Sequence, residues 1–319
     1  MSTYKEINGK KVEYLASDPS APYAGQVWYN YSSQSLKFNA GTLVQSWSTQ
    51  NTMTYGRKDP GSAGSVYNAG IAIGGQISGA NENRVESYNG SWTNVTGLPN
   101  DRTRIATTGT QTLALGCGGY TTTSISTVDS YNGSWTGQTN MPDARFSASC
   151  VGTSTSAVVF GGSGPSPALG NDTRSYNGSW TAQPDMVNSQ YSMGSSGTSS
   201  TLALAFGGYD GVASGFSNRT QIYNGSWTSL AGVLNQARAY MGSSGSTTAA
   251  IASSGNPRGV ESWNGTSWTV MPTLSTGREG LAGIGAGNAN TTVFGGEPNL
   301  NNTEQFTDNQ AGIRTITTS

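Results

Sequence analysis

Short apolar runs that end in glycine recur along most of the chain, and they predict strands rather than helices. Five of these runs end in Gly-Gly, at residues 71–75, 113–119, 157–162, 202–208 and 292–296. A sixth run, at 249–255, has Ser254 where the first glycine of the pair would stand. Apolar runs this short, bounded by turn residues, are typical of buried strands. We therefore expect one buried strand with a glycine exit in each of six segments.

A polar hairpin signal follows most of these strands. The string Tyr-Asn-Gly-Ser-Trp-Thr begins at Tyr88, Tyr131, Tyr176 and Tyr223, and a variant with one extra residue begins at Trp263. An Asn-Gly pair between two strand-like runs is a strong hairpin signal, because both residues tolerate positive φ in a type I′ turn. The sequence thus predicts paired strands over residues 85–88 and 92–95, with equivalents in the later segments.

Together these signals form an internal repeat. The tryptophans of the hairpins are 43, 45, 47 and 41 residues apart, at Trp92, Trp135, Trp180, Trp227 and Trp268. A further glycine precedes each apolar run and predicts an inner turn: Gly64, Gly109, Gly152, Gly197, Gly245 and Gly285. Each repeat then holds four strands, and the repeat occurs six times. In the last one we expect residues 303–306 as the third strand and residues 313–317 in place of the Trp strand.

Small four-stranded sheets repeated around an axis are one way in which a protein protects its strand edges. A closed ring of such sheets needs no capping units, whereas an open solenoid does. The predicted fold class is therefore all-β, a six-bladed β-propeller over residues 51–319. The apolar-Gly-Gly run followed by Tyr and then Trp resembles the kelch repeat of β-propellers, and this resemblance implies kelch-like blades.

Residues 1–50 do not fit the repeat, although residues 25–30, 35–38 and 43–47 are typical of short strands. They form either a seventh blade or a separate small N-terminal β module. The stretch from Ser17-Asp18-Pro19 to residues 36–38 resembles a leader of tailed-bacteriophage virion proteins. Residues 314–319 resemble the end of phage propeller proteins. The resemblance implies that residues 1–50 attach the chain to other virion proteins.

Composition and charge narrow the range of partners. Charged residues make up only 10% of the chain, against roughly 25% in an average domain. The formal net charge is −1, so no strong field gathers nucleic acid or anionic membrane. No apolar run is long enough to span a membrane, and no apolar core of a signal peptide follows the start. We expect neither nucleic acid nor membrane insertion.

The chain contains no histidine, which excludes imidazole acid–base catalysis and the commonest metal sites. We therefore expect no catalytic residues, no metal and no cofactor. Acidic residues recur beside the hairpins at Glu86, Asp129 and Glu261, and we interpret them as solvated strand residues. Cys117 and Cys150 are expected to be small buried thiols.

One set of residues supports a binding hypothesis. Seven residues before the inner glycines stand Arg57, Arg102, Arg145, Gln190, Arg238 and Arg278. Equivalent positions in a propeller lie on a circle, so these side chains would surround one mouth of a central channel. Such a ring would bind a carboxylate, sulfate or phosphate, for example on an acidic glycan. Alternatively, each arginine braces neighbouring backbone or an acidic residue such as Asp101, Asp143 or Glu279.

Aromatic residues follow several of the glycine exits, at Tyr120, Tyr209 and Phe216. They would stack on sugar rings, or they are ordinary scattered surface aromatics.

The leading hypothesis is a non-enzymatic virion structural protein of a tailed phage, of the tail-fibre or capsid-decoration type. It would stand on the tail or capsid surface, as a homo-oligomer or in multiple copies, and bind host-surface polysaccharide or decorate the particle. Two alternatives remain open. One is a carbohydrate-active enzyme with a carboxylate pair on a propeller face, and the other is a cellular kelch interaction module.

Overall fold

The computed structural model describes residues 12–20, 23, 25–39, 44–165, 170–211, 215–309 and 313–315. It divides into two compact units, Ser46–Thr307 and a smaller unit formed by Met1–Gln45 with Asp308–Ser319. The described residues contain no α-helix, and therefore no helix of the length and apolarity needed to cross a membrane. The expected all-β class is confirmed.

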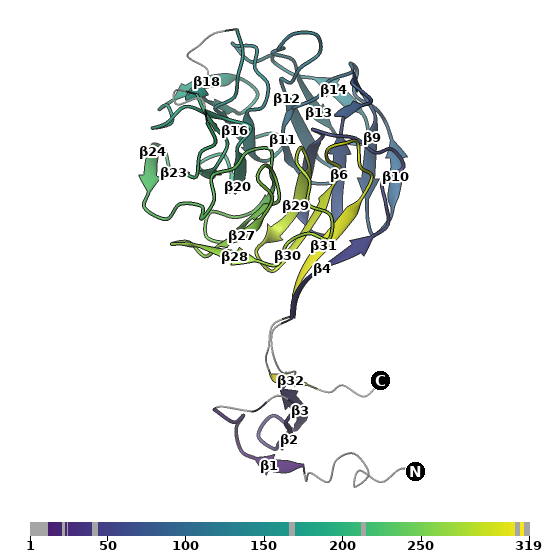
Figure 1. The fold of residues 1–319 in the computed structure, drawn as a ribbon, viewed down its shortest axis with the longest axis vertical. Coiled ribbons are helices and arrows are strands. Elements are labelled where there is room, and N and C mark those ends of the chain that lie inside the picture. Colours follow the sequence, from purple (N-terminus) through teal and green to yellow (C-terminus); the bar gives the residue numbers. More distant parts are fainter. Residues whose placement is uncertain are drawn as a thin grey trace. The chain divides into compact units, whose positions relative to one another are not determined.

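The larger unit contains six four-stranded antiparallel sheets (Figure 1). The first sheet holds β5 (Gly61–Val66), β6 (Ala69–Ile73), β9 (Val85–Tyr88) and β10 (Trp92–Val95). The second holds β11 (Ala106–Gly109), β12 (Ala114–Cys117), β13 (Val128–Tyr131) and β14 (Trp135–Gly137). The third holds β15 (Ser149–Gly152), β16 (Ala157–Phe160), β17 (Thr173–Tyr176) and β18 (Trp180–Gln183).

The remaining sheets repeat this order. The fourth holds β20 (Gly194–Ser199), β21 (Leu202–Phe206), β23 (Thr220–Tyr223) and β24 (Trp227–Leu230). The fifth holds β25 (Gly242–Gly245), β26 (Ala250–Ser253), β27 (Val260–Trp263) and β28 (Trp268–Met271). The sixth holds β29 (Ala282–Gly287), β30 (Asn290–Phe294), β31 (Thr303–Asn309) and β4 (Val44–Gln50). Two short ladders, β7 (Gln76–Ile77) with β8 (Ala80–Asn81) and β19 (Gln190–Tyr191) with β22 (Tyr209–Asp210), lie outside these sheets.

The predicted hairpins are present, with a different turn. Tyr88 lies opposite Trp92 in the register of β9 and β10, so three residues rather than two form the loop. Gly90 has a φ of 99°, whereas Asn89 keeps a negative φ, and the type I′ turn was wrong in this respect. The register places the Tyr88 and Trp92 rings 4.9 Å apart, which explains why the two aromatics recur together.

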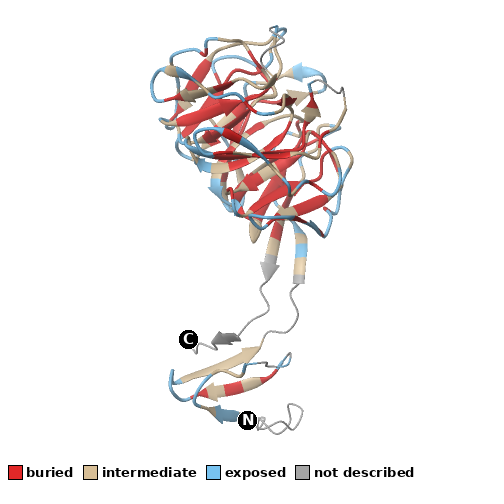
Figure 2. Cartoon of the chain, turned by 90° about the vertical axis from the view of Figure 1, so that its left-hand side faces the viewer, coloured by how far each residue is buried: buried red, intermediate tan, exposed pale blue. Residues whose placement is uncertain are grey.

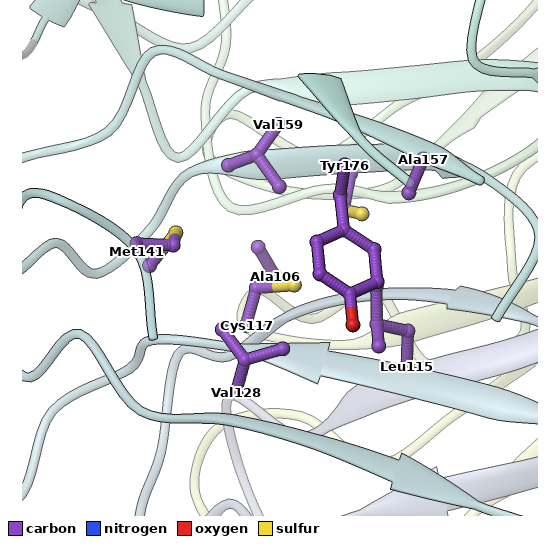
Figure 3. Packing of buried hydrophobic residues seen from close by; sticks show 9 residues of the cluster. Ala106, Leu115, Cys117, Val128, Met141, Ala157, Val159 and Tyr176 are labelled. Atoms are coloured by element: carbon purple, nitrogen blue, oxygen red, sulfur yellow. The ribbon is translucent and has the colours of Figure 1, made fainter. Parts of the chain in front are cut away.

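The hydrophobic core of the larger unit is divided into six clusters, each shared by two neighbouring sheets. Figure 3 shows the cluster between the second and third sheets, where Leu115 and Val128 meet Val159 and Tyr176. Another cluster joins the sixth sheet to the first through Phe294 and Tyr88. Buried residues are therefore concentrated in the strands of the sheets (Figure 2). Every sheet depends on both of its neighbours for the burial of its faces.

The Gly-Gly exits bind neighbouring sheets together. The N–H of the second glycine donates to the carbonyl of the arginine or Gln190 that precedes the next sheet, at 2.8–3.0 Å, in the pairs Gly75–Arg102, Gly119–Arg145, Gly162–Gln190, Gly208–Arg238, Gly255–Arg278 and Gly296–Arg57. The last pair links the sixth sheet to the first. A Cβ at the first glycine would collide with the same carbonyl, for example 2.4 Å from the Arg102 oxygen at Gly74.

Ser254 stands at the first glycine position of the fifth sheet, and its hydroxyl group forms hydrogen bonds where the other sheets need a glycine. Its φ is 57°, and its hydroxyl donates to the Arg278 carbonyl at 2.6 Å while it accepts from the Arg278 N–H at 2.9 Å. The hydroxyl therefore forms a hydrogen bond with the Arg278 carbonyl, with which a methyl group would collide.

The N-terminal and C-terminal segments join different sheets from those that the sequence suggested. Residues 44–50 join the sixth sheet, and residues 313–315 join the sheet of β1, β2 and β3. Residues 44–50 form β4, which lies beside β31 as the fourth strand of the sixth sheet (Figure 1). Trp47 of β4 packs against Phe306 at 5.3 Å and donates its indole N–H to the Pro272 carbonyl at 2.9 Å. The expectation that residues 313–317 replace the Trp strand was wrong. The division of the chain also shifts, from 1–50 and 51–319 to Ser46–Thr307 and its two flanking segments.

The small unit is built on β1 (Glu13–Leu15), β2 (Val27–Asn30), β3 (Ser35–Asn39) and β32 (Ile313–Thr315), in that order. Its core side chain is Trp28, which is fully buried. Asp18 accepts hydrogen bonds from the Trp28 indole at 3.1 Å, the Asn30 amide at 2.8 Å and the Lys37 ammonium at 2.8 Å. One carboxylate thus fixes three side chains of β2 and β3.

We expect the small unit to lose stability in acid through Asp18. Hydrogen bonds from Lys37 and Asn30 lower the pKa of Asp18 from 3.8 to about 2. Because the folded state binds the proton less readily, the stabilisation is complete above the unfolded pKa and is lost as the pH falls towards 2. Unfolding of the unit, followed by Trp28 chemical shifts between pH 5 and 2, should show this loss. An Asp18→Asn variant should lack that part of the pH dependence, and an unchanged profile would contradict the assignment.

We expect the sixth sheet to need β4. A chain of residues 44–309 keeps all its strands, whereas a chain of residues 52–309 lacks β4 and leaves Phe306 without Trp47. Loss of that aromatic contact and of one strand should cost at least about 2 kcal/mol. Urea unfolding of both chains measures the difference, and equal midpoints would show that β4 is dispensable.

Candidate functional site

The side chains expected around an open channel mouth are buried instead. Their exposed fractions are 0–1% for Arg57, Arg102, Arg145, Gln190, Arg238 and Arg278. They form hydrogen bonds within their own sheets, where Arg57, for example, donates to the Gly74 carbonyl at 3.0 Å. A fully buried guanidinium is not available to an external anion, so the expected anion-binding ring is corrected to a set of internal braces.

The partners of these arginines are carboxylates in the third strands, or, for Asp172, directly before the third strand. Ion pairs join Arg57 to Glu86, Arg102 to Asp129, Arg145 to Asp172, Arg238 to Glu261 and Arg278 to Glu304. Glu86, Asp129 and Glu261 are therefore buried, and their interpretation as solvated residues was wrong. The bracing alternative holds. Of the acidic partners suggested for it, Asp143 does lie 3.9 Å from Arg145, whereas no ion pair joins these arginines to Asp101 or Glu279 among the described residues.

Two repeats depart from this pairing of an arginine with a carboxylate. The fourth repeat replaces both members, and Gln221 donates its amide to Gln190. In the third repeat Arg174 occupies the carboxylate position, and Asp172 binds both Arg145 and Arg174. The paired change of Gln190 and Gln221 is the sequence signal that could have identified the partners, because charge is lost from both positions at once.

Burial has opposite consequences for the two kinds of partner. It lowers the pKa of Arg57, Arg102 and Arg238, and the paired carboxylates oppose this change. Burial alone would raise the pKa of Glu304, but hydrogen bonds from Ser275 and Arg278 bring it below its usual value. The ion pairs thus oppose the effect of burial on the charged groups.

A second set of six residues, one before each sheet, lines a common hollow. We call Asp59, Arg104, Ser147, Ser192, Tyr240 and Gly280 the mouth ring. Each stands two residues before the first strand of its sheet and has a φ between 50° and 64°. Each donates its N–H to the carbonyl of the preceding member at 2.8–3.1 Å, and Asp59 donates to Gly280. The first strands of all six sheets line the cavity of about 600 Å³ behind this ring.

One side of the mouth is charged. A hollow of about 300 Å³ is lined by Lys58, Asp59, Arg104, Tyr240, Glu279, Gly280 and Glu297. Arg104 donates to Asp59 at 3.1 Å, and Lys58 pairs with Glu297 at 2.8 Å. The Arg104 guanidinium also lies 5.9 Å from the centre of the Phe146 ring, which in turn contacts Tyr120 edge-on.

The neighbouring side of the mouth is aromatic. We call Tyr191, Tyr209, Phe216 and Tyr240 the aromatic wall. Tyr209 is its centre, stacked on Tyr191 at 5.1 Å and meeting Phe216 and Tyr240 edge-on at 4.9 and 5.7 Å. All four rings are half-buried. Tyr209 and Phe216 were expected as exposed loop aromatics, and the structure adds Tyr191 and Tyr240 from the segments that precede the fourth and fifth sheets.

Tyr191 and Tyr240 are neutral hydrogen-bonding groups. Burial and the neighbouring Tyr209 raise the pKa of both phenols. The wall thus offers flat apolar faces together with hydroxyl groups, the combination that suits sugars.

The remaining candidate groups carry no chemistry at the mouth. Cys117 and Cys150 are free, buried and part of one cluster. A hydrogen bond with Cys117 and burial raise the pKa of Cys150. Among the residues that the structure describes, no group of three or more histidine, cysteine, aspartate or glutamate side chains is placed to hold a metal ion.

Comparisons with known proteins extend the fold but not the function. No family model and no curated protein matches this sequence. A solved structure named "Structure of YjhT" is similar, with a TM-score of 0.68 and 12% identity over 84% of this chain and 99% of that chain. At this identity the similarity shows a shared all-β fold alone.

We expect the buried ion pairs to tolerate joint replacement and not single replacement. Arg102→Gln leaves Asp129 buried without its countercharge, which should cost about 3–5 kcal/mol. Arg102→Gln with Asp129→Gln copies the Gln190–Gln221 pair and should recover most of that loss. Urea unfolding measures both. A double variant as unstable as the single one would show that charge pairing is not what these positions require.

Proposed function

We propose that the chain is a non-enzymatic virion structural protein of a tailed phage, whose larger unit binds host-surface glycan at the mouth ring. The observation that carries the proposal is the aromatic wall, four clustered rings beside a charged hollow.

We also propose that the larger unit is a closed, six-bladed, kelch-like β-propeller. Two series of backbone hydrogen bonds support the closure, because each returns from the sixth sheet to the first, at Gly296–Arg57 and at Asp59–Gly280. The hydrophobic cluster of Phe294 and Tyr88 supports it independently. Six sheets, rather than seven, follow from the pairing of β2 and β3 with β1 and β32.

The glycan assignment follows from the chemistry of the mouth. Sugar rings present apolar faces that stack on aromatic side chains, and hydroxyl groups that pair with forked donors and acceptors. Tyr209 and Tyr191 supply the first kind of group, and Arg104 and Asp59 supply the second.

Attachment to the particle is assigned to the small unit. The resemblance of residues 17–38 to phage leaders supports contact with other virion proteins on the tail or capsid. The small unit exposes two aromatic side chains for such contact, because Tyr14 is 74% exposed and Tyr31 is 55% exposed.

A second candidate is a carbohydrate-active enzyme, because three carboxylates line the charged hollow: Asp59, Glu279 and Glu297. Turnover of a glycan panel that is abolished by Glu279→Gln would favour it over simple binding.

We expect the aromatic wall to be required for glycan binding. Tyr209→Ala removes the central ring and should weaken binding to host-cell polysaccharide at least about tenfold, since an aromatic contact is worth about 1.5 kcal/mol. Surface plasmon resonance with extracted polysaccharide measures the loss. Leu113→Ala is a matched control, because Leu113 is exposed and lies after the first strand, away from the mouth ring. Wild-type binding in Tyr209→Ala would refute the glycan assignment, and absence of the chain from purified particles would refute the virion assignment.

A further inference from the structure

The mouth ring carries side chains in a backbone conformation that favours glycine. Five of its six members have φ values between 50° and 58° and are not glycine. Asp tolerates this left-handed region, whereas arginine and tyrosine are strained there because of their Cβ and long side chains. Strained residues of this kind are concentrated at functional sites. Folding alone therefore does not explain why arginine and tyrosine, rather than glycine, stand at positions 104 and 240.

Both of these residues line a space large enough for a ligand. Arg104 and Tyr240 both line the charged hollow, and Tyr240 also belongs to the aromatic wall through Tyr209. At the sixth position the ring has Gly280, where a Cβ would lie 2.7 Å from the Asp59 carboxylate. The one glycine of the ring thus leaves room for the side chain of Asp59.

The charges around the hollow favour one class of ligand. Lys58 and Arg104 face Asp59, Glu279 and Glu297, which gives a formal excess of one negative charge. Arg104 and Lys58 are both engaged in ion pairs. Among the described residues, no cation lies within ion-pair distance of Glu279. A sugar carboxylate placed here would meet an unpaired carboxylate and no free cation.

We propose that Asp59, Arg104, Tyr240 and Glu279 determine the specificity of the mouth, and that they select neutral glycans over glycans bearing uronate or other carboxylate groups. The proposal rests on the glycan-binding function proposed above and names its ligand class. Carboxylate and guanidinium groups held in ion pairs bind vicinal hydroxyls through paired hydrogen bonds, while Tyr240 supports the ring face. It replaces the expectation of an acidic glycan, which depended on arginines that are buried.

The first test compares one polysaccharide in two charge states. The probe is the host polysaccharide that the full-length protein binds, before and after oxidation of its primary hydroxyls to carboxylates. We expect the oxidised form to bind at least about tenfold more weakly. Glu279→Gln removes the unpaired carboxylate and should narrow that ratio by roughly threefold or more. Equal or tighter binding of the oxidised form overturns the proposal.

The second test separates strain from function. Arg104→Gly and Tyr240→Gly relieve the left-handed strain and should keep the thermal midpoint at or above that of the wild type, while neutral-glycan affinity falls at least about tenfold. Ser78→Gly is the matched control, because Ser78 has a φ of 49° and lies outside the mouth ring and the charged hollow, and it should bind as the wild type does. If Tyr240→Gly does not fold, Tyr240→Asn, which tolerates the same φ, takes its place.

The outcomes distinguish the two proposals. If the wild type binds neither form of the polysaccharide, both the glycan-binding function and this inference fail. If Tyr209→Ala loses binding but the wild type prefers the oxidised form, or if Arg104→Gly and Tyr240→Gly bind normally, only the specificity assignment fails.

Discussion

The hydrogen bonds that pass from each sheet to the next are the constraint on which the rest of the structure depends. A four-stranded sheet of this size cannot bury both faces alone. Each sheet therefore needs a neighbour at a fixed distance, and the backbone sets that distance twice, at the second glycine of the exit and at the mouth ring. The glycine pair exists because the carbonyl of the next segment approaches within 2.4 Å of where a Cβ would lie at Gly74.

The buried ion pairs follow from the same arrangement. Arg57 and its equivalents lie in the segment that enters each sheet, and their carbonyls already accept the inter-sheet bonds. Their side chains then tie the second and third strands together from inside, through Gly74 and Glu86 in the first sheet. The fourth repeat has the equivalent contact without either charge, between Gln190 and Gln221. The pair fixes geometry, and its charge is needed only as long as a charged partner is present.

Much of the strand order could be predicted from the sequence, because turn chemistry is local. The pairing of Val85–Tyr88 with Trp92–Val95 follows from the hairpin signal, whereas their register depends on a three-residue loop that the signal did not predict. What could not be predicted depends on direction and on partners far away in the chain. Spacing places Arg102 on a circle, but it does not say whether the side chain faces the axis or Asp129. The strand β4 was missed as a member of the sixth sheet because its partner β31 lies more than 250 residues later, although Trp47 supplies the tryptophan that the sixth repeat lacks.

The pairing of the N-terminal strands β3 and β4 with the C-terminal strands β32 and β31 has a mechanical consequence. The chain enters the larger unit through β4 and leaves it through β31, which are neighbours in one sheet, and it joins the small unit through the neighbours β3 and β32. Tension applied to the small unit therefore divides between two chain segments that are anchored side by side. Those segments belong to the sheet whose Gly296 and Gly280 bond to Arg57 and Asp59 of the first repeat. Resistance to pulling and the hydrogen bonds between the sixth and first repeats thus involve the same sheet.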